Sequence, residues 1–137
     1  MWCLAGLTAG GTSELTSTAL VRARCCELLG EHLPTSEGAS ELFLVGLCSL
    51  LDAMLGRPLE DAIAELPLSA SARDAVLGAG SRAPRRVLEA VIAYENGQWD
   101  EAAESATAAG LSPSMLPSAY NGALAWARQF SREALAA

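Results

Sequence analysis

Apolar residues recur at three- and four-residue intervals along most of this chain, which is the spacing of helices with one buried face. In the first such stretch Thr12 or Ser13 can cap a helix, and Pro34 stops it near Leu33. Its apolar stripe consists of Val21, Cys25, Leu28, Leu29 and His32. The polar residues that fall mostly off this stripe are Arg22, Arg24, Glu27 and Glu31. We therefore expect a long helix that packs on a core along one side.

A second stretch, from about Ser40 to Leu55, is apolar almost all round. This pattern is typical of a helix that is buried on every side, so we expect it at the centre of a bundle. Gly56 can end this helix, and Pro58 suits the first position of a short helix that runs to Leu66.

Helical patterns continue in the second half of the chain and are separated by Gly and Pro. Helices are predicted from Ser69 or Ser71 to about Leu77, over residues 85–95, from Asp100 to Ala109, and from Ser112-Pro113 onward. The loops between them contain Gly78, Gly80, Pro84, Asn96-Gly97 and Gly110. Pro117 lies past the first turn of the last helix, so that helix either kinks or begins there. No stretch alternates with period two for long enough to predict a sheet.

The predicted fold class is therefore all-α, a bundle of about seven or eight helices with no sheet. Of the 137 residues, 51% are hydrophobic and only 5% are aromatic, a composition that favours aliphatic helix packing. We expect residues 1–137 to form a single helical domain, with residues 1–12 as a truncated edge and residues 131–137 as a frayed tail.

Charge and cysteine usage restrict the function classes. The formal net charge of −7 disfavours binding to nucleic acid or to an anionic membrane. The apolar run from Leu42 to Leu51 is too short to cross a bilayer. A secretory signal has basic residues before its apolar stretch, and none precedes the apolar N-terminal segment here. The cysteines, Cys3, Cys25, Cys26 and Cys48, lack the two-residue spacing of zinc or redox motifs. We expect buried, reduced thiols in a cytoplasmic protein.

Residues suited to catalysis are sparse. A metal-dependent hydrolase needs several His and Asp ligands, and a nucleophilic Cys or Ser needs a base. The one histidine, His32, is more simply a capping or partly buried side chain, and Asp52 is expected to meet solvent. We therefore predict no catalytic, cofactor-binding or metal-ligating residue and no cofactor. The arginines, Arg22 with Arg24 and Arg82 with Arg85 and Arg86, either clamp a phosphate or carboxylate or, as we favour, lie on solvated helix faces.

The segment from Tyr94 to Ala102 resembles the turn between the two helices of a tetratricopeptide repeat. Gly97 lets the turn close, Trp99 packs over it, and Ala102 admits the neighbouring helix. Only one copy is visible, and stacked repeats need about three, so a helical hairpin within another fold is the favoured interpretation.

The segment from Glu41 to Asp52 carries a further resemblance. It is similar to the F-L-x-G-L-L-H-D-I-G segment of HD-type domains, with Ser49-Leu50 at the position of the His-Asp pair. Together with Ala19–Leu29, Ala53–Leu59, Ile63–Leu68 and Tyr94–Asp100, it makes residues 15 to 128 resemble the C-terminal half of the HDOD family, of the type fused to EAL domains in bacterial signalling proteins. A serine hydroxyl is a poor metal ligand and leucine is none.

The resemblance implies an HD-domain-like helical module without catalytic activity. Besides the His-Asp pair, HD-type domains have another ligand histidine, and the matching position in this chain falls near Ala23, so that ligand is absent as well. It implies regulation in cyclic-di-GMP-related signalling through protein contacts, with protein partners or an EAL-type domain of the same parent. Trp2, Leu4 and Leu7 at the truncated edge predict self-association. Two alternatives stay open, a tetratricopeptide-like adaptor and a divergent HD-type metal-dependent phosphohydrolase.

Overall fold

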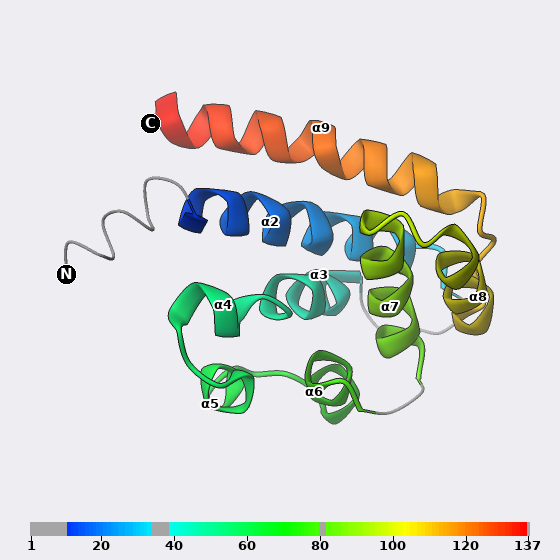
Figure 1. Cartoon of the computed structure of the whole chain (residues 1–137), viewed down its shortest axis with the longest axis horizontal. Coiled ribbons are helices and arrows are strands. Elements are labelled where there is room, and N and C mark those ends of the chain that lie inside the picture. The colour runs from blue at the N-terminus through cyan, green and yellow to red at the C-terminus, as the bar shows by residue number, and fades with distance from the viewer. Residues whose placement is uncertain (1–10, 34–38, 80–81, 137) are drawn as a thin grey trace.

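The protein is described by a computed structural model that covers residues 11–33, 39–79 and 82–136. Within these ranges the chain forms eight helices and no strand, which confirms the predicted all-α class (Figure 1). The helices are α2 (Gly11–Gly30), α3 (Ala39–Cys48), α4 (Leu51–Leu55), α5 (Leu59–Ile63), α6 (Ala70–Leu77), α7 (Ala83–Glu95), α8 (Trp99–Ala109) and α9 (Met115–Ala136).

Two of the predicted boundaries concern the chain ends. Most of the predicted truncated edge at residues 1–12, with Trp2, Leu4 and Leu7, lies outside the described residues. The backbone of α9 is helical as far as Ala136, and the fraying of residues 131–137 stays a prediction.

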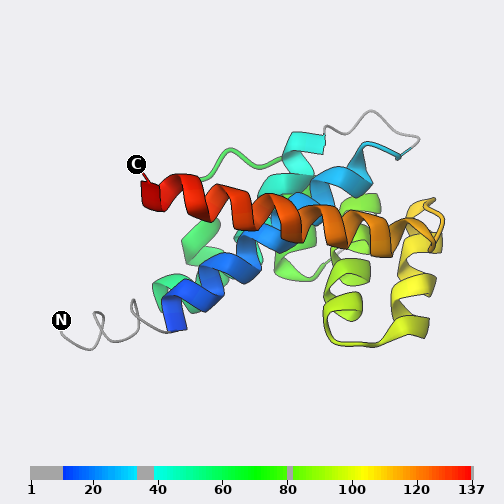
Figure 2. The same ribbon diagram turned by 90° about the horizontal axis from the view of Figure 1, so that it is seen from above.

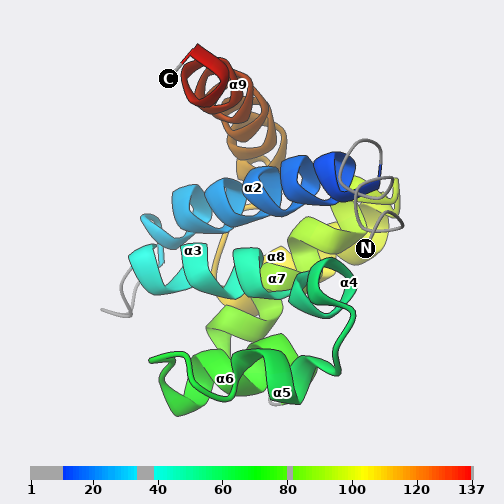
Figure 3. The same ribbon diagram turned by 90° about the vertical axis from the view of Figure 1, so that its left-hand side faces the viewer.

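Helix α2 is the helix that the others enclose. It packs against α3 on one side and α9 on the other, and α7 also contacts it. In Figure 3 α9, α2, α3 and α6 follow one another from top to bottom, and Figure 2 shows α9 crossing over α2. The largest fully buried side chains are Leu29, Leu42, Ile63, Leu88, Val45, Val87 and Val91, with Cys25, Cys26 and Cys48. The prediction that the helix over residues 40–55 is the central one is wrong, because Leu44 and Leu55 on it are exposed.

Small residues bring α2 and α3 into backbone contact. Ala23 on α2 is fully buried, and a Cβ added to Gly46 on α3 would lie 2.7 Å from the Ala23 Cα. Gly30 ends α2, three residues before the predicted end at Leu33, where Leu42 of α3 packs against it. Pro34, the predicted stop, lies outside the described residues. The close α2–α3 crossing therefore depends on residues without side chains or with a single methyl group.

The predicted continuous helix from Ser40 to Leu55 is wrong, because it divides into α3 and α4 at Ser49-Leu50. The Ser49 hydroxyl donates to the Gly46 carbonyl at 2.7 Å and so competes with the regular helical hydrogen bond. Leu50 has φ −114° and ψ 7°, outside the helical region. Gly56 ends α4 with φ 65°, as predicted.

Most local signals of the second half are confirmed. Ser69 caps α6 by accepting a hydrogen bond from the Ala72 N–H, and Gly78 ends it with positive φ. Pro84 was predicted in a loop but lies in the first turn of α7, where a proline has no N–H bond to lose. Pro117 is likewise tolerated because α9 begins two residues before it, at Met115.

One further boundary differs slightly from prediction. Helix α5 ends at Ile63 instead of Leu66, and the Arg73 guanidinium donates to the carbonyls of Ile63 and Leu66 at 3.4 Å.

Helices α7 and α8 form the predicted antiparallel hairpin. Across the described part of the chain, no helix combines the length and apolarity needed to span a membrane.

Candidate functional site

A buried ion pair lies where α2, α3 and α7 meet. The Arg22 guanidinium on α2 binds the Glu95 carboxylate at the end of α7 through two nitrogens, at 2.7 and 3.3 Å. A third nitrogen donates to the Ser49 hydroxyl at 2.9 Å. The side chains of Arg22 and Glu95 are only 10% and 11% exposed. Because the pair is bidentate and has little access to water, it fixes α7 against the α2–α3 crossing.

This cluster includes the positions singled out by the HD-type segment. Ala23 and Gly46 touch at the helix crossing, so the neighbouring Arg22 and Ser49 are brought together. The prediction that Arg22 lies on a solvated helix face is wrong, because it is buried at the core. The sequence carries no signal for this burial, since its partner Glu95 is 73 residues away.

The chemistry of the cluster is that of a closed, satisfied ion pair. Ser49 accepts from Arg22 and donates to the Gly46 carbonyl, so its hydroxyl is engaged on both sides. A guanidinium has no lone pair for a metal, and its charge repels a cation placed beside it. In the part of the chain that the structure describes, no three His, Cys, Asp or Glu side chains are placed together to hold a metal ion.

Three cysteines lie close to this cluster in the core. Cys25, Cys26 and Cys48 are free and buried, as predicted, whereas Cys3 lies outside the described residues. Burial, and to a smaller extent the Glu95 carboxylate, raises the pKa of Cys25 to about 12. Burial raises the pKa of the Cys26 and Cys48 thiols as well. Because the thiolate is the nucleophile, these side chains are inert at neutral pH.

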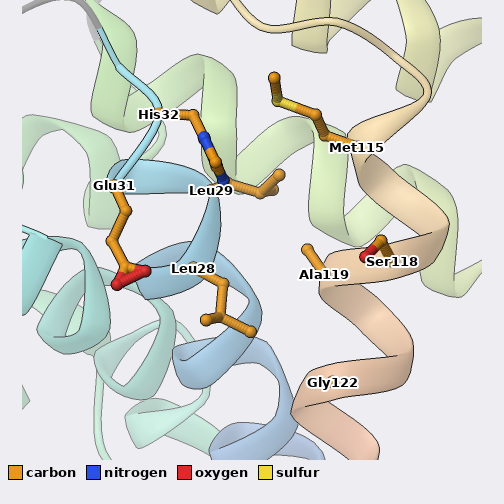
Figure 4. A pocket seen from close by; sticks show the side chains of 8 residues that line it. All are labelled: Leu28, Leu29, Glu31, His32, Met115, Ser118, Ala119 and Gly122. Carbon is orange, nitrogen blue, oxygen red and sulfur yellow. The ribbon is translucent and has the colours of Figure 1, made fainter.

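His32 lies in an exposed turn after α2, so of the two predicted roles, capping or partly buried, the second is wrong. It lines a cavity of about 320 Å³ between the end of α2 and the start of α9 (Figure 4). Figure 4 shows the Glu31 carboxylate and the His32 ring pointing to different sides. Within the described residues, no hydrogen bond joins the His32 ring to Ser118, the hydroxyl that lines the same cavity.

The other charged candidates are tied to local partners or to solvent. Arg85 and Arg86 both pair with Glu89 on their own helix, at 3.4 and 3.2 Å. Arg24 pairs with Glu27 at 2.6 Å and lies over the Trp126 ring. Arg82 and Asp52 are exposed. Arg82 thus has the predicted solvated position, whereas Arg24, Arg85 and Arg86 are half-buried and paired with carboxylates of their own helices.

The α7–α8 turn has the geometry predicted from its sequence. Gly97 has φ 73°, Ala102 is buried, and the Tyr94 and Trp99 rings meet edge to face with centroids 5.1 Å apart. Sequence reasoning missed that the Trp99 side chain remains mostly outside this packing, with 61% of the residue exposed. The groove beside it is lined by Tyr94, Trp99, Ala102, Ala103, Pro113, Leu116 and Pro117.

Comparison with known proteins gives two partial matches. The chain is 35% identical over 91 residues to YuxH, an uncharacterized protein of Bacillus subtilis (strain 168), covering 66% of this chain and 22% of YuxH. It is 36% identical over 56 residues to the cyclic di-GMP phosphodiesterase CdgJ of Vibrio cholerae serotype O1, covering 41% of this chain and 13% of CdgJ. The chain thus matches about a fifth or less of either relative. No family model and no solved structure matches.

Proposed function

We propose that this chain is a non-catalytic regulatory module of HDOD type that belongs to a bacterial, cyclic-di-GMP-related signalling protein and acts through protein contacts. The link to cyclic di-GMP rests on the similarity to CdgJ, a cyclic di-GMP phosphodiesterase by name, over 56 residues. The HDOD assignment rests on the resemblance carried by the segment from Glu41 to Asp52 and by the order of the flanking segments. The all-helical fold is consistent with it.

The observation that carries the non-catalytic part is the Arg22–Glu95–Ser49 cluster. In an HD-type enzyme this region would hold a cation, and here it holds the Arg22 guanidinium, 2.9 Å from the Ser49 hydroxyl. A divalent metal placed at Ser49 would meet a buried positive charge with too few donors. The buried pair instead joins three helices, which is the role of a scaffold.

The partners we propose are proteins, including an EAL-type domain of the same parent. The net charge of −7 supports this choice over nucleic acid or an anionic membrane, because both carry negative charge and would repel the chain. We also keep a cytoplasmic location as part of the proposal. The reading frame upstream of Met1 tests the link to a parent, because an adjoining EAL-like domain is the expected finding.

Metal analysis combined with a turnover assay tests the non-catalytic role. We expect the purified chain to hold only background Mn, Fe and Zn and to leave cyclic di-GMP and a generic phosphodiester uncleaved when these metals are added. Stoichiometric metal together with turnover would overturn the proposal in favour of a divergent HD-type phosphohydrolase. An Arg22→Met variant is the control for turnover by a contaminating enzyme. Such turnover would be the same in preparations of the variant and of the unaltered chain.

A further inference from the structure

Two neighbouring hollows on the surface share the Trp99 side chain. One is the apolar groove of about 350 Å³ along α8, which we call the Trp99 groove, between Tyr94 on α7 and Leu116 on α9. The other, of about 290 Å³, is more polar and is lined by Gly97, Gln98, Trp99, Asp100 and Glu101. An occupant that spans both would meet an apolar floor, an indole face and two carboxylates in succession.

The Trp99 groove is held in its shape by the packing around it. The Tyr94 ring contacts Trp99 on one side and Tyr120 of α9 on the other, with centroids 5.1 and 5.2 Å apart. The positive φ of Gly97 sets the turn that presents Trp99. The indole therefore contacts the Tyr94 ring while 61% of the residue lies in water, more than any other large exposed apolar side chain described. Trp and Tyr are enriched among the residues that contribute most to the binding energy of protein interfaces.

The charged residues in the chain segment that lines the groove are all acidic. Between Val87 and Ala127 the sequence has five carboxylates and no basic residue. Glu89 and Glu95 pair with arginines, as described above. Asp100, Glu101 and Glu104 on α8 are exposed and form no ion pair with a described residue. Asp100 and Glu101 also stabilise the first turn of α8, but that role leaves their outer oxygens free for a cationic partner.

We propose that the Trp99 groove binds an extended segment of a partner protein in which an Arg or Lys neighbours an apolar side chain of leucine size. The cationic group lies over the Trp99 ring beside Asp100 and Glu101, and the apolar side chain enters between Tyr94 and Leu116. The charge complementarity selects this occupant over an acidic segment. This inference rests on the proposed contact-based function and names the chemistry of the partner.

The test is a titration of the full chain, followed by the backbone and indole N–H signals in nuclear magnetic resonance spectra. The probe is the acetylated and amidated heptapeptide Gly-Ser-Leu-Arg-Leu-Ser-Gly, and two matched peptides carry Gln or Glu in place of Arg. We expect the arginine peptide to shift the Trp99 indole signal, which is assigned by its absence in Trp99→Phe. The glutamine peptide should bind with a dissociation constant at least about fivefold higher. The difference should shrink with added salt.

Protein variants distinguish the site from general charge effects. Asp100→Asn/Glu101→Gln should weaken the binding of the arginine peptide by about five- to tenfold, because the cation loses two carboxylate partners. The matched control is Glu60→Gln/Asp61→Asn, which changes the net charge equally in the first turn of α5, at the opposite end of the view in Figure 1. It should leave binding unchanged. Because Trp99→Ala has no indole signal, its binding is followed through the backbone N–H signals of Tyr94 to Leu116, which should no longer shift, and melting curves are recorded to show that the variant is folded.

Several results would refute the inference. These are equal binding of the three peptides, equal effects of the two double variants, signals that map to the His32 cavity, or a Trp99 signal that shifts with protein concentration alone, which would indicate a second copy as occupant. These outcomes are separate from metal loading or turnover, which would refute the proposed function and leave the peptide titration unaffected.

Discussion

At the scale of single residues, Arg22 shows how far burial can depart from the local pattern. Its neighbours on the helix predict a polar, outward position, yet it is 9% exposed and paired with Glu95. A guanidinium is costly to bury alone and becomes tolerable when a carboxylate and a hydroxyl satisfy it. Arg22 and Glu95 therefore depend on one another more than either depends on its own helix.

The first prediction concerns this pair. Glu95→Ala should lower the free energy of unfolding by about 3 kcal/mol, because it leaves the Arg22 charge buried without a partner. The double variant Arg22→Met/Glu95→Ala should lose less than the sum of the single variants Arg22→Met and Glu95→Ala by about 1 kcal/mol or more. Urea unfolding of the four proteins measures both quantities.

The half-buried pair of Arg24 and Glu27 is the control for this cycle. Because both side chains reach solvent, Glu27→Ala should cost no more than about 1 kcal/mol. Equal losses for Glu27→Ala and Glu95→Ala would contradict the structural role given to the buried pair.

The second prediction concerns thiol reactivity. With its pKa raised to about 12 by burial, Cys25 has about one thiolate in ten thousand at pH 8, and Cys26 and Cys48 are protected by burial as well. Iodoacetamide should therefore leave these three unmodified in the native protein and label them in urea, as read by peptide mass spectrometry. Labelling of Cys26 without urea at the urea rate would contradict this.

The same shift predicts how stability responds to alkali. The folded pKa of Cys25 lies above its ordinary value of 9.0, so the neutral thiol stabilises the fold fully below pH 9. The contribution falls as the pH rises from about 9 towards 12, since the unfolded chain ionises first. Urea midpoints should decline over this range, and Cys25→Ala, although less stable at pH 7, should show a smaller decline.

At the scale of elements, the α2–α3 crossing determines where the helix over residues 40–55 is interrupted, which helix propensity does not predict. The apolar pattern around residues 40–55 is strong enough to predict one buried helix, but Ser49 interrupts it and Arg22 holds the interruption in place. The central helix is the one that packs against other helices on several sides. Helix α2 has partners on several sides, and α3 leaves Leu44 exposed.

The third prediction tests the crossing with two glycines. In Gly46→Ala the new methyl group would lie 2.7 to 2.9 Å from backbone atoms of Arg22 and Ala23, which cannot turn away as a side chain can. We expect a loss of about 2 kcal/mol or more in the free energy of unfolding.

The matched variant is Gly122→Ala in the interior of α9. Its methyl group would meet only the Leu28 side chain at 3.4 Å, an ordinary contact, and alanine favours the helix. Stability should be unchanged or rise by up to about 1 kcal/mol. Similar effects of the two substitutions in thermal unfolding would show that the α2–α3 contact is looser than described.

At the scale of the whole molecule, one buried network connects parts of the chain that are distant in the sequence. Arg22, Ser49 and Glu95 bring together α2, α3 and α7, and α9 covers α2 from the other side. A module built in this way can present surfaces on separate elements, such as the Trp99 groove, while its centre stays rigid. This agrees with a function through contact.

The fourth prediction concerns assembly. Trp2, Leu4 and Leu7 give the N-terminal segment an apolar sequence, and apolar groups that meet water favour association. We expect a dimer or larger species in light scattering at micromolar concentration, and a monomer for the variant Trp2→Ser/Leu4→Ser/Leu7→Ser. A clean monomer of the unaltered chain would refute self-association, and an oligomer that persists in the variant would assign it to another surface.

The sequence by itself determined the helical class, the glycine-ended helices, a serine cap at Ser69 or Ser71 and the Tyr94–Ala102 turn. These features depend on backbone geometry and on side chains within a few positions of one another, and both can be read along the chain. Only the tertiary structure decided that α2 is central, that Arg22 meets Glu95, and that Trp99 remains exposed beside a groove. Each of these depends on atoms brought together from distant segments, where packing and desolvation outweigh local preference.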